Sequence, residues 1–205
     1  MKMTGKNNDQ KKKKIVEAEE YYQKGLVYAQ ESDADRAIEC WQKTLEVNPD
    51  HFDAWYNMGN AYYIGKEDFE GAFPFWEKAL DLNPEGVDVL YNIGNAFRER
   101  GEYDKAIEYY KKIIEIIPDD HETWNNMANT YHFKGDSEEA IRCWKKAVTI
   151  KPDKIETWFN LAVRYRELRK YDLALECCQK ALEIRPDFRQ AQRLLDTIND
   201  EKERA

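Results

Sequence analysis

Three histidines are the side chains of this 205-residue chain best suited to acid–base catalysis or metal binding. They are His51, His121 and His132, and they are not spaced as metal ligands. Neither a glycine-rich phosphate loop nor a nucleophile elbow occurs in the sequence. The sequence therefore predicts a protein that is not an enzyme and that holds no metal and no cofactor.

The four cysteines indicate packing. They are Cys40, Cys143, Cys177 and Cys178, and they lack the close paired spacings of a zinc site. Three of them, Cys40, Cys143 and Cys177, share one position of a repeated segment, as expected of small apolar side chains on a helix. A chain of this length needs no disulfide framework, which fits a cytoplasmic location.

Asparagines are the polar side chains that recur without a role in an apolar stripe. One set comprises Asn57, Asn92, Asn126 and Asn160, and the second comprises Asn60, Asn95 and Asn129. An amide offers donors and an acceptor together, so a row of them can pair with the N–H and C=O groups of an extended peptide. The alternative is that these amides form hydrogen bonds between neighbouring helices.

Aromatic and cationic side chains accompany the asparagines. The aromatic candidates are Tyr56, Tyr63, Tyr91, Phe133 and Phe159, and the cationic ones are Arg98, Arg164 and Arg166. Aromatic rings are well suited to gripping the side chains of a bound peptide. We expect that some of these residues serve packing instead.

The elements that must position these residues are helices in a repeated pair. Prolines mark the period, because Pro49, Pro84, Pro118, Pro152 and Pro186 are spaced 35, 34, 34 and 34 residues apart. Within one unit Trp124, Met127, Ala128 and Tyr131 recur at helical spacing and form one apolar stripe. A period near 34 with two such stripes is typical of a helix-turn-helix repeat.

These units closely resemble the tetratricopeptide repeat. Its motif is met in full by Trp55, Met58-Gly59, Tyr62, Ala72, Trp76, Ala79 and Pro84. The resemblance implies an all-α fold, an α-solenoid in which five helix pairs and a terminal helix wind as a right-handed superhelix. It also implies that the first helices line a concave groove, where the asparagines look like the ladder that holds peptide in the O-linked GlcNAc transferases.

The repeat pattern also predicts how the chain is divided. Residues 1–16 are expected to be a basic, disordered tail, and residues 17–188 five repeats of about 18–51, 52–86, 87–120, 121–154 and 155–188. Residues 189–205 are expected to form a solvating helix over the last repeat, with Leu194 and Ile198 on its apolar stripe. A dimer contact through this stripe is the alternative, and a monomer is favoured over a homodimer.

The second repeat departs from the pattern. It is one residue longer than the others and carries Pro74 inside its expected second helix. Because proline lacks the N–H that a helix interior needs, we expect a kink or a delayed helix, with an irregularity between Gly65 and Pro74.

The choice of partner follows from charge and from the resemblance. A net charge of -8 argues against nucleic acid, and no apolar run is long enough for membrane insertion. Co-chaperone repeats that clamp an acidic C-terminus carry lysine and arginine beside such asparagines, but the matching positions here hold residues such as Tyr22, Leu26 and Glu122. The sequence therefore predicts a cytoplasmic adaptor that binds a protein or peptide in its groove. The alternative is a scaffold that assembles with itself through its ends or its convex face.

Overall fold

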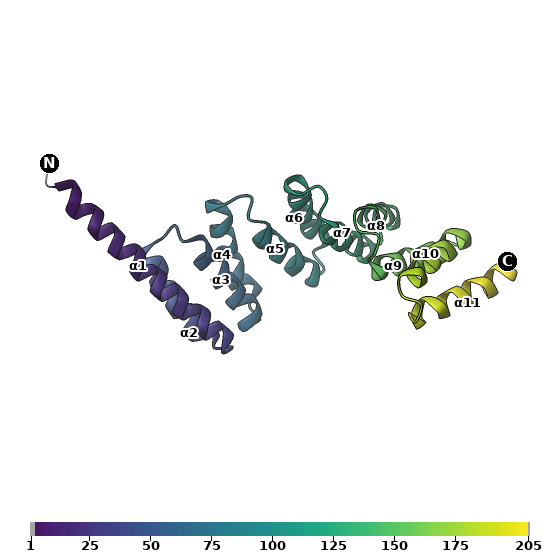
Figure 1. Cartoon of the computed structure of the whole chain (residues 1–205), viewed down its shortest axis with the longest axis horizontal. Coiled ribbons are helices and arrows are strands. Elements are labelled where there is room, and N and C mark those ends of the chain that lie inside the picture. The colour runs from purple at the N-terminus through teal and green to yellow at the C-terminus, as the bar shows by residue number, and fades with distance from the viewer. Residues whose placement is uncertain (1–2, 205) are drawn as a thin grey trace. The chain divides into compact units, whose positions relative to one another are not determined.

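The computed structural model describes the backbone of residues 3–204 and the side chains from Lys13 onward. Within that range the chain consists of helices joined by short turns and contains no strand, which confirms the predicted all-α repeat fold (Figure 1). The α-helices are α1 (Met3–Gln30), α2 (Ala34–Val47), α3 (Phe52–Asn60), α4 (Phe69–Leu82), α5 (Val87–Glu99), α6 (Tyr103–Ile116), α7 (His121–Lys134), α8 (Ser137–Ile150), α9 (Ile155–Glu167), α10 (Tyr171–Ile184) and α11 (Arg189–Glu203). A π-helical turn, η1 (Ala61–Gly65), follows α3.

The chain divides into two compact units, Met1–Ile93 and Gly94–Ala205. The first unit holds α1 to α4 with η1 and the first part of α5. The second holds the remainder of α5 and the helices from α6 to α11. In each unit the helices follow one another as the antiparallel pairs that the sequence repeat predicts.

A glycine on a first helix packs directly against a large aromatic residue of the second helix. A methyl group at Gly25 would come within 2.3 Å of Trp41 Nε1, and one at Gly59 within 2.3 Å of Trp76 Cδ1. Trp41 and Trp76 are buried as a result, with 2% and 0% of their surface exposed. The small residue of each motif therefore sets how closely the paired helices approach.

A residue in the left-handed backbone region joins the two helices of every pair. Gly101 and Gly135 have φ angles of 76° and 93°, which glycine adopts without strain. The equivalent positions of the other pairs hold Ser32, Glu67 and Arg169, with φ of 61°, 54° and 55°. The turn geometry is thus kept even where the sequence has lost its glycine.

Asp33, Asp68 and Asp136 start the helices that follow these turns. Each carboxylate accepts a hydrogen bond from the backbone N–H three residues ahead, at 3.0, 2.9 and 3.3 Å. Such a cap satisfies one of the free N–H groups at a helix start and fixes where α2, α4 and α8 begin.

The prediction that Pro74 would delay its helix is wrong. Helix α4 runs without interruption from Phe69 to Leu82 and contains Pro74. Pro74 and Glu70 are both exposed, so water can reach the backbone where the proline supplies no N–H. The extra residue of this repeat is accommodated earlier, in the π-helical turn η1.

The two ends of the chain are also helical. Helix α1 begins at Met3, so the backbone is helical where the sequence predicted a disordered tail; its Lys and Gln residues have good helix propensity without needing a core. At the other end α11 buries Ala191 with Ile155 and Ala181. Leu194 and Ile198 are 8% and 0% exposed, so this chain itself covers the stripe for which a dimer contact was the alternative.

The contact at Gly25 leads to a stability prediction. Gly25→Ala should lower the free energy of unfolding by about 1–3 kcal/mol, because the new methyl group overpacks Trp41. Lys24→Ala is the control, since it introduces the same residue at the adjacent, exposed position and should change stability little. Urea denaturation measures both, and equal stability of the two variants would contradict a close contact.

The strained turn at Glu67 leads to a prediction of opposite sign. Glu67→Gly should raise the free energy of unfolding by about 0.5–1 kcal/mol, because glycine adopts positive φ without a Cβ clash. Lys66→Gly should destabilise, since Lys66 has an ordinary φ of -115° and pairs with Asp35. Thermal melting of both variants checks the sign, and destabilisation by Glu67→Gly would show that the turn carries no strain.

Candidate peptide-binding surface

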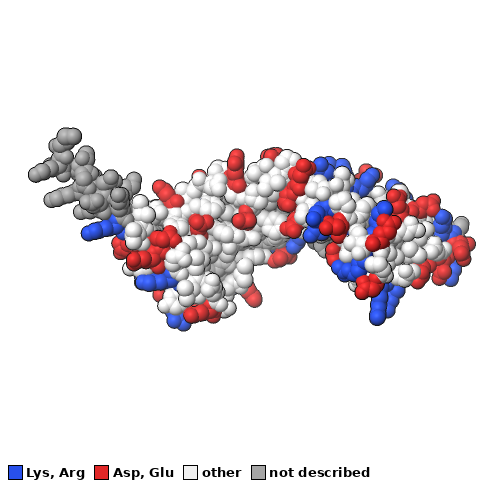
Figure 2. All heavy atoms as spheres, in the orientation of Figure 1, with Lys and Arg blue, Asp and Glu red and all other residues white. Residues whose placement is uncertain are grey.

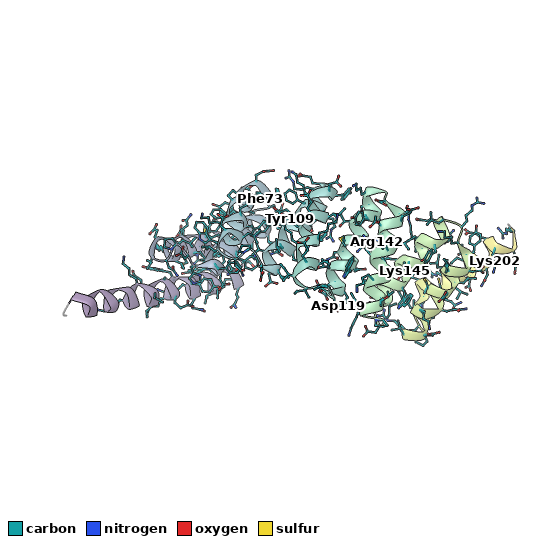
Figure 3. All side chains as sticks on the ribbon, turned by 90° about the horizontal axis from the view of Figure 1, so that it is seen from above. Phe73, Tyr109, Asp119, Arg142, Lys145 and Lys202 are labelled. Carbon is teal, nitrogen blue, oxygen red and sulfur yellow. The ribbon has the colours of Figure 1, made fainter. Side chains whose placement is uncertain are left out.

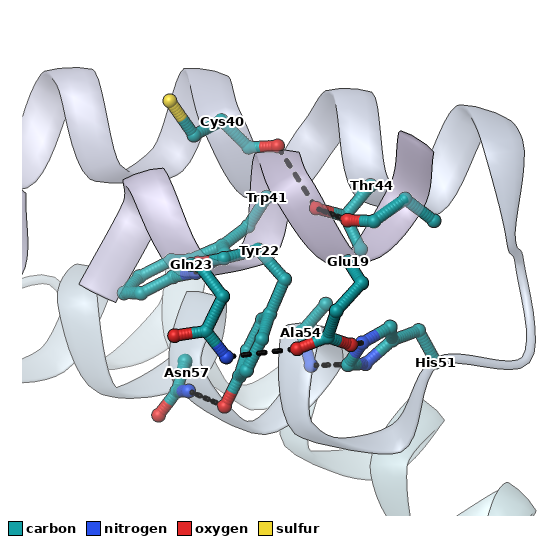
Figure 4. Close-up of polar contacts among 10 residues, drawn as sticks. Glu19, Tyr22, Gln23, Cys40, Trp41, Thr44, His51, Ala54 and Asn57 are labelled. Carbon is teal, nitrogen blue, oxygen red and sulfur yellow. Dashed lines mark hydrogen bonds and ion pairs between the residues drawn. The ribbon is translucent and has the colours of Figure 1, made fainter. Parts of the chain in front are cut away.

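The first set of asparagines links consecutive first helices. Asn57 Nδ2 on α3 donates a hydrogen bond to the Tyr22 hydroxyl on α1 at 3.0 Å (Figure 4). Asn92 Nδ2 on α5 repeats this contact with the Tyr56 hydroxyl on α3, also at 3.0 Å. The helix-to-helix hydrogen bonding that was the alternative reading of the sequence is therefore present.

The second set of asparagines accepts hydrogen bonds from the aromatic residues of the second helices. Asn60 Oδ1 accepts from Trp76 Nε1 at 3.0 Å and from Asn92 Nδ2 at 2.8 Å. Asn129 Oδ1 repeats both contacts, with Trp144 Nε1 at 3.1 Å and Asn160 Nδ2 at 3.4 Å. One carbonyl oxygen thus joins a helix pair to the first helix of the next pair.

Two further members of the asparagine sets lie in the second unit. Asn95 Oδ1 accepts a hydrogen bond from the Tyr110 hydroxyl at 2.7 Å, in the same way that Asn60 accepts from Trp76. Asn126 is half-buried on α7, in the slot of Asn57. Several of the asparagine side chains therefore bond two helices together.

These internal bonds fix which end of each amide points away from its partner. Asn57, Asn92 and Asn160 donate through Nδ2, and among the described residues their Oδ1 atoms accept no hydrogen bond. Asn60 and Asn129 accept through Oδ1, and their Nδ2 groups donate to no described residue. The five side chains are half-buried, and they present acceptors from one set and donors from the other. An extended backbone needs both.

The aromatic candidates differ in what they contact. The Tyr56 hydroxyl is taken by Asn92, and Tyr63 packs edge-on against Trp76 with ring centroids 5.4 Å apart. Phe159 packs against Phe188 at 5.4 Å, and Tyr91 is half-buried on α5. Phe133 is 63% exposed although its ring stacks on Tyr103 at 6.3 Å. Phe133 is thus the aromatic candidate with the most surface to offer.

The arginine candidates also differ in their contacts and exposure. Arg166 Nε donates to Glu201 Oε2 at 3.0 Å, which ties α9 to α11 and lowers the pKa of the Glu201 carboxyl. Arg98 is half-buried in the last turn of α5. Arg164 pairs through Nη1 with Glu167, and its side chain is only 17% exposed. Arg166 is therefore engaged in structure, whereas Arg164 is held in place but keeps other N–H groups.

Two pockets occupy equivalent positions of different repeats. In the first unit a pocket of about 460 Å³ is lined chiefly by apolar residues. These are Leu26, Ala29, Ala34, Ala37, Trp41, Ala61 and Ile64, together with Ser32, Asn57, Asn60 and Gly65. In the second unit a pocket of about 340 Å³ is lined by Asn129, His132, Phe133, Trp144, Asn160, Val163 and Arg164. Each lies beside the second-helix tryptophan, with asparagines at its wall.

The pocket walls include residues that the sequence patterns did not select. Ile64 is 74% exposed although it is large and apolar. The ring of His132 lies near those of Trp144 and Phe133, at 5.8 and 5.6 Å. Comparing the repeats position by position would have shown that His132 and Arg164 replace the small residues Ala29 and Ala61 of the first unit.

The cysteines and the remaining histidines form no reactive site in the part of the chain that the structure describes. Burial raises the pKa of the Cys143 and Cys177 thiols to about 12 and that of Cys178 to about 11, so these residues stay protonated at neutral pH. The described residues contain no group of His, Cys, Asp and Glu side chains placed to hold a metal ion. Nor does any described helix have the length and apolar content to cross a membrane.

Comparison with known proteins agrees with this geometry. The sequence models of the tetratricopeptide repeat match residues 18–65, 52–85, 87–120, 121–154 and 155–188. A stretch of 50 residues is 40% identical to an uncharacterized protein of Methanocaldococcus jannaschii. That match covers 24% of this chain and 58% of the relative, so it spans little more than half of the relative's length.

Three solved structures show a similar fold. The MamA protein superposes with a TM-score of 0.73 at 22% identity, over 82% of this chain and 91% of that one. PilF of Pseudomonas aeruginosa gives 0.72 at 18% identity, over 92% and 87%. YrrB gives 0.69 at 25% identity, over 84% and 89%, and is described as a tetratricopeptide repeat protein with an unusual peptide-binding site.

The paired helices and their small-residue contacts define a helical repeat protein. The chain belongs to the tetratricopeptide repeat family. The fold is one that serves protein interaction, and nothing in it points to catalysis.

The number of hydrogen bonds that an asparagine side chain makes predicts how much its removal destabilises the protein. Asn92→Ala removes bonds to Tyr56 and Asn60 and should lower the free energy of unfolding by about 1–3 kcal/mol. Asn57→Ala removes a single bond and should cost about 0.5–1.5 kcal/mol. Chemical denaturation measures both, with Asn199→Ala on the exposed face of α11 as the control. A loss at Asn57 as large as that at Asn92 would contradict the assigned bonds.

Proposed function

We propose that this chain is a non-catalytic adaptor that binds an extended segment of a partner protein along its first helices. The observation that carries the proposal is the orientation of the asparagine amides. Internal bonds turn the carbonyls of Asn57, Asn92 and Asn160 and the amino groups of Asn60 and Asn129 away from their partners. Acceptors and donors on successive helices are what the N–H and C=O groups of a peptide backbone require.

Side-chain contacts would supply the specificity of this binding. Hydrogen bonds to the backbone are insensitive to sequence, whereas apolar and aromatic pockets discriminate between side chains. The apolar pocket beside Trp41 and the exposed ring of Phe133 are suited to that role. The net charge of -8 supports a protein partner over nucleic acid, whose phosphates would be repelled.

A substitution that keeps the internal bonds separates binding from stability. In Asn60→Asp and Asn129→Asp the carboxylate oxygen still accepts from Trp76 or Trp144, but the presented amino group becomes a negative oxygen. Each variant should remain folded and should bind a peptide about tenfold more weakly, the equivalent of roughly 1.4 kcal/mol.

The test uses peptides selected from a random library on the wild-type chain. Their Kd values are measured by calorimetry against wild type, the two aspartate variants and Asn199→Asp, which adds the same charge on the exposed face of α11. Weakening by the first two alone supports the proposal. Equal affinity in all four proteins, or a selection that yields no ligand, would refute it.

A self-assembling scaffold is the second candidate function. Helix α1 exposes Ile15 and Val16, at 54% and 58%, and apolar side chains next to one another on a helix can pair two copies. Sedimentation over a wide concentration range distinguishes the two functions. A monomer at all concentrations favours the adaptor, and a dimer that Ile15→Ser abolishes favours the scaffold.

A further inference from the structure

The first repeat lacks a large side chain that every later repeat has. In the first helix of each pair, the fourth residue after the small one is a ring or a long cation in the later repeats, namely Tyr63, Arg98, His132 and Arg166. The first repeat carries Ala29 there. In the second repeat the ring packs on the second-helix tryptophan, because Tyr63 lies edge-on against Trp76 with centroids 5.4 Å apart. In the first repeat the corresponding space belongs to the pocket of about 460 Å³ that Ala29 and Trp41 line.

This pocket is open to a ligand. Ala29, Ser32 and Ile64 are exposed, and Ile64 is 74% exposed. Ala37 and Trp41 are buried and form the floor of the pocket. The volume lies within the range of about 300–1,000 Å³ that is usual for ligand pockets. A ligand therefore enters past exposed residues at the rim and does not have to reach a buried atom.

The walls of the pocket are suited to an aromatic ring. They carry no charged residue, and Leu26 stands where three later repeats have an asparagine. Leu26, Ala61 and Ile64 therefore offer mainly carbon atoms to a ring. Asn57 also lines the pocket, and its Oδ1 accepts no hydrogen bond from a described residue. That oxygen can pair with the hydroxyl group of a tyrosine or the indole N–H of a tryptophan.

The unit that holds this pocket is strongly acidic. Residues 15–93 include 17 acidic residues against five basic ones, so their net charge is -12. Asp and Glu side chains are spread over the displayed face of this unit (Figure 2). Residues 141–205 instead include 15 basic residues against 11 acidic ones, among them Arg142, Lys145 and Lys202 (Figure 3). The acidic charge is thus local to the first part of the chain, where it favours a basic partner.

We propose that this pocket binds one aromatic side chain from a basic segment of the partner protein. The ring lies over Ala29 and beside Ile64, in the place that Tyr63 fills in the second repeat, and Lys or Arg residues next to it face the acidic surface. The basic residues 1–14 of this chain include no aromatic residue, so they cannot supply the ring. The inference rests on the proposed binding of a partner segment, for which it names the chemistry of one contact.

The experiment follows the methyl signals of Ala29 and Ile64 in carbon-13 NMR spectra of the full chain. Three capped tripeptides are the probes: acetyl-Lys-Tyr-Lys amide, acetyl-Lys-Ala-Lys amide and acetyl-Glu-Tyr-Glu amide. We expect the first probe to shift both signals with a Kd of about 1 mM. The peptide without a ring should leave them unshifted. The acidic peptide should bind about tenfold more weakly, because the acidic surface repels it.

Substitutions in and beside the pocket make the outcome decisive. Ala29→Tyr supplies the missing ring from the chain itself and should abolish the shift of the Ile64 signal. This variant should remain folded, because Tyr63 occupies the equivalent position of the second repeat. Ile64→Ser removes an exposed apolar side chain and should weaken the binding read at Ala29 by about threefold. Gln42→Tyr, which adds the same ring on the exposed face of α2 outside the pocket, should leave the binding unchanged.

Three results would overturn the aromatic site. They are signals that move with no probe, signals that move equally with the peptide that lacks a ring, and binding that persists in Ala29→Tyr. Equal affinity for the acidic peptide would also overturn the proposal, because it would exclude a basic segment. The function proposed above is judged separately, since selected peptides whose affinity falls in Asn129→Asp but not in Ala29→Tyr would uphold it while this pocket fails.

Discussion

The structure depends on the contact between a small residue of each first helix and the large aromatic residue of the second. Gly25 with Trp41, Gly59 with Trp76 and Gly94 with Tyr110 leave no room for a side chain at the glycine. In the second and third pairs the polar atom of the aromatic ring comes close to the residue that follows the small one along the first helix. That residue is Asn60 or Asn95, which accepts its hydrogen bond. In the first pair, where Leu26 follows Gly25, Trp41 Nε1 donates to the backbone carbonyl of Tyr22 instead.

The same hydrogen bonds connect each helix pair to the next and orient a side chain there. The oxygen of Asn60 that receives the Trp76 indole also receives the Asn92 amide, so the position of one pair sets the orientation of an amide in the following pair. Contacts of this kind join neighbours only, as expected for a repeat protein. They also leave the opposite end of each amide available, which is how one side chain can serve both stability and binding.

The sequence predicted the helix pairs because Pro49 and its counterparts, the glycine turns and the apolar stripes act locally. It failed at Pro74, because a proline at an exposed position costs too little to break a helix that Asp68 caps. It gave no sign that Glu67 or Arg169 would keep positive φ, since a lost glycine does not reveal whether the turn changes with it. Amide orientation and the unpartnered nitrogens of His132 and Arg164 depend on contacts between repeats, which residue spacing does not encode.

The central claim is that internal bonds commit one end of each asparagine and leave the other for a ligand. Solvent exchange of the side-chain amide protons, measured by NMR on the free protein, tests it most directly. The account predicts that both Nδ2 protons of Asn92 and one Nδ2 proton each of Asn57 and Asn160 exchange slowly, while both protons of Asn60 and Asn129 exchange rapidly. Rapid exchange at Asn92 together with protection at Asn60 would contradict it.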